Sequence, residues 1–76
     1  MTTLYWYVDE FNGGSRGICW DTEEEARADM WEHIKTIKPT EQIIGKTVAL
    51  IKGKFENNKP VKLEKIQVVV LVEDKE

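Results

Sequence analysis

Apolar side chains occupy consecutive positions near the start of the chain, in a run rich in aromatic types. Odd and even positions are both apolar, and the residues concerned are Leu4, Tyr5, Trp6, Tyr7 and Val8. Aromatic and β-branched residues favour strands. The run therefore predicts a β-strand over residues 3–9 with apolar side chains on both of its faces.

A turn is predicted directly after this strand. Asn12, Gly13 and Gly14 are residue types that tolerate positive φ, as tight hairpin turns require. Ile18 and Trp20 then alternate with Cys19. We expect residues 16–20 to return antiparallel and to complete a first hairpin.

The pattern changes to a helical period after Asp21. Thr22 and Glu25 have the spacing of a capping box, and the acidic side chains at residues 23–25 suit the positive end of a helix dipole. Four apolar positions then fall on one helical stripe, with His33 at its edge: Ala26, Met30, Ile34 and Ile37. The sequence therefore predicts a helix that begins at Thr22 and cannot extend far beyond Pro39.

Two further strands are predicted in the second half of the chain. Residues 47–55 and 61–72 are rich in β-branched and apolar types, and Asn57, Asn58 and Pro60 mark a turn between them. The inward positions change from odd to even within the last strand, so we expect a β-bulge near Glu64 or Lys65. The elements predict one α+β domain over residues 1–76, a ββαββ antiparallel sheet with one helix packed on one face.

One helix covers one face of a sheet, but the strands are apolar on both. We assign four of these residues to the uncovered face, and they are Tyr5, Tyr7, Val69 and Leu71. Trp31 lies off the apolar stripe of the helix, where it either folds over the sheet edge or serves as an interface anchor, and it is a further candidate because tryptophan is enriched in binding hot spots. These five residues are our predicted partner-binding residues. A homodimer and a second protein partner are both expected from them, because exposed apolar patches mark interfaces.

Composition places the chain among folded intracellular domains. It has 76 residues, of which 41% are hydrophobic and 33% charged, and it has a single cysteine. Small secreted domains depend on several disulfides, so we expect a cytoplasmic location. The longest aliphatic run has five residues, at 68–72, which is too short for a signal peptide or a membrane span.

Charge suggests an alternative partner. The net charge is -3, yet residues 46–65 hold six lysines and two glutamates. On the second hairpin, the lysines best placed to contact nucleic-acid phosphates are Lys52, Lys54, Lys59 and Lys62. Lysines also protect sheet edges, and the acidic total charge opposes long-range attraction. Nucleic-acid binding by this hairpin is therefore the second hypothesis.

Catalytic and metal chemistry find little support in the residue types. His33 and Cys19 are the single histidine and the single cysteine, too few for a zinc site, and we expect no metal and no cofactor. Neither residue has an evident catalytic partner, so we expect a packed histidine, a packed cysteine and no enzymatic activity. Residues 13–17, rich in glycine, match neither phosphate-binding loop motif and are interpreted as a turn.

The sequence therefore favours a small non-catalytic accessory or regulatory protein that binds a protein partner. A strand pair that leads through Asp21-Thr22 and an acidic run into a helix is similar in style to many short accessory proteins of bacteria and their phages. That likeness implies an origin, but it carries no functional residue.

Overall fold

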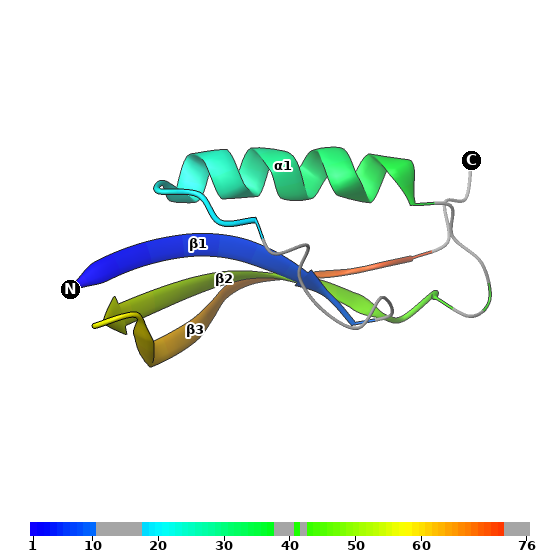
Figure 1. Cartoon of the computed structure of the whole chain (residues 1–76). Helices are drawn as coiled ribbons and strands as arrows, with labels where there is room; N and C mark the ends of the chain where they lie inside the picture. The colour runs from blue at the N-terminus through cyan, green and yellow to red at the C-terminus, as the bar shows by residue number, and fades with distance from the viewer. Residues whose placement is uncertain (11–17, 38–40, 42, 73–76) are drawn as a thin grey trace.

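The computed structural model describes residues 1–10, 18–37, 41 and 43–72. Within them the elements are β1 (Thr2–Asp9), α1 (Glu23–Thr36), β2 (Thr47–Glu56) and β3 (Lys59–Val70). The strands form one antiparallel sheet in the order β1-β2-β3. Figure 1 shows α1 lying along one face of this sheet. The fold is α+β, as the sequence predicted.

The predicted ββαββ order is not observed, because three strands are present in the described residues instead of four. Residues 11–17, which hold the predicted turn and the start of the second strand, lie outside the description. What remains of that strand is a bridge between Tyr5 and Trp20, with N···O distances of 2.9 and 2.8 Å. Trp20 therefore sits beside β1, while Ile18 and Cys19 belong to no strand.

The start of α1 agrees with the sequence prediction. Thr22 is the N-cap: its hydroxyl oxygen accepts from the Glu25 N–H at 3.2 Å, and the hydroxyl donates to the Glu25 carboxylate at 2.9 Å. These contacts satisfy a backbone donor that the first helical turn leaves unpaired. The last helical residue is Thr36, and the C-cap is Ile37, whose N–H donates to the Ile34 carbonyl. Pro39 lies outside the described residues.

The β2–β3 hairpin is built on Asn57 and Asn58, both at positive φ, 51° and 64°. Two such residues fit a type I′ turn, which matches the twist of the flanking strands. Farther along, Gln67 pairs with Leu50 and Lys65 with Ile51, so Ile66 is an extra residue in β3. The predicted bulge is thus confirmed, one residue beyond Lys65.

The core lies between α1 and the sheet. Its fully buried side chains come from the predicted helical stripe and from β2, namely Ala26, Met30, Val48 and Leu50. Tyr7 completes the cluster, and Trp20, Ile34, Ile37, Ile66 and Val69 are among the partly buried residues packed against it. The helix packs on β1 and β2, and the β3 backbone does not lie directly beneath it.

Glu10 fastens the end of β1 to the beginning of β2. Its carboxylate accepts hydrogen bonds from the Thr47 N–H at 2.9 Å and from the Thr47 hydroxyl at 3.1 Å. These two bonds lower the pKa of Glu10, because they favour the ionised carboxylate. Within the described residues, no helix has the length and apolar character needed to cross a membrane.

Candidate functional site

The sheet face turned away from α1 carries apolar side chains from all three strands. Trp6 lies opposite Ile51, and Ile51 lies opposite Lys65. Directly opposed residues share a face, and alternation extends the face along each strand. We call this surface the open face, and define it as Leu4, Trp6, Val8, Ala49, Ile51, Gly53, Phe55, Val61, Leu63, Lys65, Val68 and Val70.

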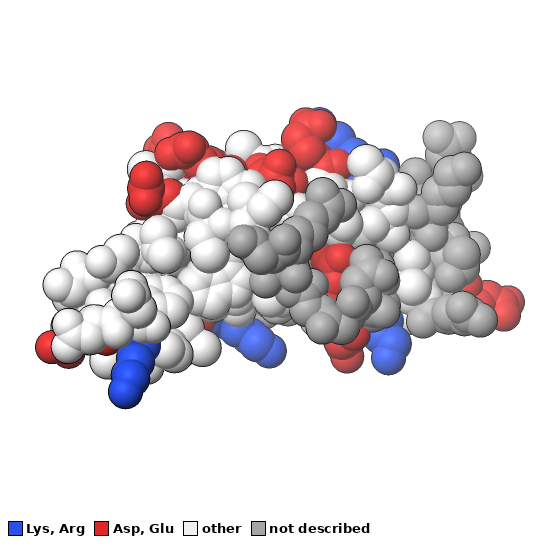
Figure 2. Space-filling view, viewed as in Figure 1, with Lys and Arg blue, Asp and Glu red and all other residues white. Residues whose placement is uncertain are grey.

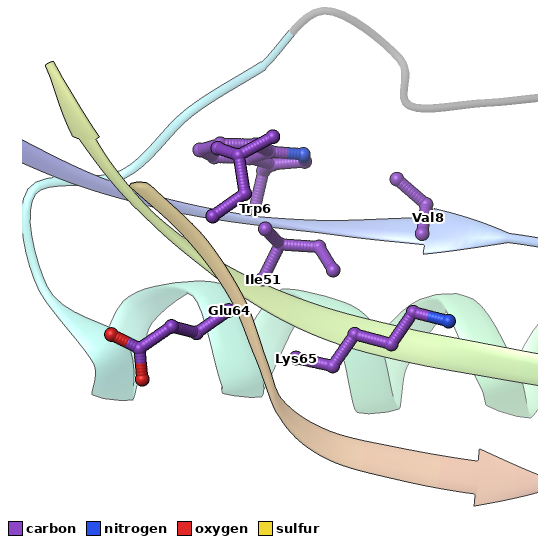
Figure 3. Close-up of a pocket in the computed structure, with 6 residues that line it drawn as sticks. Trp6, Val8, Ile51, Glu64 and Lys65 are labelled. Atoms are coloured by element: carbon purple, nitrogen blue, oxygen red, sulfur yellow. The ribbon is translucent and has the colours of Figure 1, made fainter. Parts of the chain in front are cut away.

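A hollow of about 310 Å³ lies on the open face, lined by Trp6, Val8, Ile51, Leu63, Glu64 and Lys65. Figure 3 shows the Trp6 ring and the Ile51 side chain gathered in it, with the Lys65 chain beside them and the Glu64 carboxylate pointing elsewhere. Glu64 instead lies 3.4 Å from Lys62 in an exposed ion pair. The hollow is therefore apolar with one cation at its border.

Gly53 determines how the aromatic part of this face is packed. A Cβ at Gly53 would collide with the Trp6 ring and would lie 2.9 Å from the Phe55 ring. The glycine thus permits the Trp6 ring to approach β2 closely. Trp6 and Phe55 contact each other at a centroid distance of 6.0 Å and an angle of 44°. These contacts hold Trp6 in place at one side of the hollow.

Exposure on the open face is concentrated on β3. Ala49 and Ile51 in the central strand are 3% and 8% exposed, because side chains on both sides cover them. The apolar residues that β3 contributes to the open face are all at least half exposed, and they are Val61, Leu63, Val68 and Val70. Folded proteins seldom expose several large apolar side chains on one face, so the open face is the candidate site.

The assignment of Tyr5, Tyr7, Val69 and Leu71 to the uncovered face is wrong. Tyr7 and Leu71 are buried, and Tyr5 and Val69 pack against the core beneath α1. Within the described part of the chain, the sheet does have an apolar face that no element covers, as predicted, but this face carries the alternate set of residues. Both sets in β1 are apolar, so their parity alone could not decide which one faces the helix.

Trp31 is 40% exposed on the surface of α1. It projects from the helix, whereas the open face lies on the opposite side of the sheet, so the two candidate surfaces are separate (Figure 1). Figure 2 shows that acidic side chains gather over α1. Any partner that docks on Trp31 meets this acidic surface, and a partner on the open face does not.

The four lysines of the nucleic-acid hypothesis share one face of the hairpin. Lys54 lies opposite Lys62, Lys52 opposite Glu64, and Lys59 opposite Glu56. This is the face on the α1 side of the sheet. Two glutamates alternate with the lysines there, and the acidic first turn of α1 belongs to the same side of the molecule. The local charge is consequently mixed.

A buried polar pair lies between α1 and β1. His33 Nε2 is 2.6 Å from Asp9 Oδ2, and the two side chains are 7% and 6% exposed. The Tyr7 ring contacts the His33 ring at 5.2 Å, and the Tyr7 hydroxyl donates to Asp29 at 2.9 Å. A second hollow, of about 200 Å³, is lined by Tyr7, Asp29, Glu32, His33 and Thr36.

His33 is packed near the helix end, as expected, but the structure supplies a carboxylate partner that the sequence did not reveal. The sequence shows that Asp9 has the same parity as Tyr5 and Tyr7, but only the structure shows that this parity faces the helix. Cys19 is exposed, so the expectation of a packed cysteine is wrong. Among the described residues, no group of three or more potential metal ligands occurs. Residues 13–17 lie outside the described part of the chain.

The described residues form a small α+β fold with one sheet face covered by a helix and the other face left uncovered by any described element. No protein-family model matches this chain, and neither a curated protein nor a solved structure matches it.

Proposed function

We propose that this chain is a non-catalytic accessory protein that binds another protein through its open face. One observation carries the proposal: apolar side chains from three strands form a continuous surface around a hollow, and the described residues leave β3's share of it at least half exposed. Apolar burial is the main driving force of protein association. The face is also preformed, since Gly53 and Phe55 hold Trp6 in place, which reduces the ordering cost of binding.

The chemistry of the face indicates what the partner presents. A hollow lined by Trp6, Val8, Ile51 and Leu63 suits one large apolar or aromatic side chain. Lys65 at its border is the one charged residue of the open face. It favours a carboxylate next to that apolar anchor, because complementary charge fixes the register of an interface. The proposed partner is thus a protein segment with an apolar anchor beside an acidic residue.

Leu63→Glu is expected to reduce partner capture by at least about tenfold, since it places a charge in the apolar contact. Leu63 is 58% exposed, so the variant should remain folded. The measurement is quantitative capture from extracts of the native host, with a photo-crosslinking residue placed at position 63 to identify what lies on the face. Trp31→Ala is the matched variant on α1 and should leave capture unchanged.

The same pair of variants can overturn the proposal. A partner that is retained by Leu63→Glu and lost by Trp31→Ala would move the binding surface to α1. A crosslinker at the exposed Ala28 of α1 provides the control for random collisions. Equal labelling from positions 28 and 63 would count against a specific contact on the open face.

Nucleic-acid binding is the second candidate, favoured by the register that puts Lys52, Lys54, Lys59 and Lys62 on one face. We expect no binding tighter than about micromolar at physiological salt, the weak non-specific range. Fluorescence anisotropy with labelled single- and double-stranded DNA and RNA, over a salt titration, measures this. Tight, salt-sensitive binding that disappears when the four lysines become glutamine would reverse the ranking.

A further inference from the structure

β3 is an edge strand, and its two halves differ in how the edge is protected. Within the described residues β2 is its sheet neighbour on one side, and no strand lies on the other. The first half contains Pro60, Lys62 and Lys65 and register shifts that leave Val61 and Ile66 as extra residues. Lysines, prolines and bulges are the devices that keep exposed edges from pairing. Residues 67–72 contain none of them and read Gln-Val-Val-Val-Leu-Val.

The backbone groups that face outward along this unprotected half follow from the hydrogen bonds of Leu71. Its N–H donates to the Lys46 carbonyl at 2.9 Å, and its carbonyl accepts from the Gly45 N–H at 2.8 Å. Both groups therefore point toward the β2 side. Because residues of an antiparallel strand alternate in this respect, the N–H and C=O groups of Val68 and Val70 point toward the outer edge.

We propose that a second copy of this chain pairs with that edge, antiparallel, about a two-fold axis perpendicular to the sheet. Val69 then lies opposite Val69 of the partner subunit, and Val68 lies opposite Val70 of the partner subunit. The two-fold axis also places Val70 opposite Val68 of the partner subunit. The outward N–H and C=O groups of these two pairs therefore form four hydrogen bonds. The product is a continuous sheet of six strands, and the interface is self-complementary, as a two-fold dimer requires.

Charge fixes the register of this pairing. With the axis at Val69, the Lys65 residues of the two copies lie roughly 25 Å apart along the strands, at about 3.3 Å per residue. An axis at Lys65 would put the two lysines directly opposite each other, and like charges in that position destabilise a sheet. α1 packs on β1 and β2, and its Arg27 donates to the Gln67 side chain on the α1 side of the sheet. The helix therefore leaves the outward backbone groups of Val68 and Val70 clear in the plane of the sheet. The half-exposed side chains of Val68 and Val70 each gain a valine of the partner subunit as a cross-strand neighbour.

This dimer goes beyond the proposed function, because it uses the strand edge and not the hollow. Light scattering or sedimentation at micromolar concentration should report twice the 8.8 kDa chain mass. Val70→Pro removes an outward N–H and leaves the bonds to β2 in place, since proline is tolerated on an edge strand. We expect it to raise the dimer dissociation constant at least tenfold, whereas Val70→Thr, which keeps the N–H, should change it by less than threefold.

A crosslinking variant supports the proposal without depending on the proline. In a Cys19→Ser background, Val69→Cys should give a disulfide-linked dimer on mild oxidation, because residues facing each other in a non-hydrogen-bonded pair lie about 4.5 Å apart at Cα. Val72→Cys should not, since its two copies would be roughly 20 Å apart at the same rise per residue. Two results would overturn the proposal. One is an unmodified chain that is still monomeric at about 100 micromolar, and the other is a dimer that Val70→Pro leaves intact and that Val69→Cys fails to link.

Discussion

Asp9→Ala is expected to lower the free energy of unfolding by about 1 to 3 kcal/mol, the usual cost of leaving a buried polar group without its hydrogen-bond partner. Asp9 and His33 are both more than nine-tenths buried and lie 2.6 Å apart. Small domains have only about 5 to 15 kcal/mol in total, so this loss is a large fraction of the stability of the domain. Urea denaturation followed by tryptophan fluorescence measures the change.

Glu32→Ala is the matched control for this effect. It removes the carboxylate that contacts Lys35 at 3.2 Å, where both side chains are 72% exposed. Exposed ion pairs contribute about 0 to 1 kcal/mol, so the free energy of unfolding should hardly change. If Asp9→Ala and Glu32→Ala lowered the free energy of unfolding by similar amounts, burial would not be what makes the Asp9–His33 pair stabilising.

Leu50→Ala is expected to cost about 2 to 5 kcal/mol, because Leu50 is completely buried beneath α1 and truncation leaves a cavity. Leu63→Ala, the same substitution on the open face, should cost less than about 1 kcal/mol, since that side chain is already 58% exposed. The two leucines lie on opposite faces of one sheet. Thermal unfolding of both variants tests the face assignment, and equal losses would refute it.

Local signals predicted much of the secondary structure correctly. The capping residues Thr22 and Glu25 located the start of α1, and its apolar stripe identified Ala26 and Met30 as core. The change of parity in the last strand identified a bulge at Ile66 to within a residue or two. Each of these features depends on neighbours within a few positions, which the sequence displays directly.

Features that depend on contacts between elements were not predictable in the same way. The period of β1 was clear, but both of its faces are apolar, and the choice between them is made by α1 and by the Asp9–His33 pair. That pair joins residues 24 positions apart. The open face was therefore predicted to exist and was assigned the wrong residues. Gly53 also gave no sign that the Trp6 ring would lie against it.

The three tryptophans lie in three different environments, so each can serve as a fluorescence reporter of its own region. Trp6 borders the hollow on the open face, Trp20 stacks on Tyr7 at a centroid distance of 6.0 Å, and Trp31 is exposed on α1. Versions that keep one tryptophan at a time would give emission from one environment each. Occupancy of the open face would then appear as a change in the Trp6 spectrum alone, and loss of the helix–sheet contact as a change in that of Trp20.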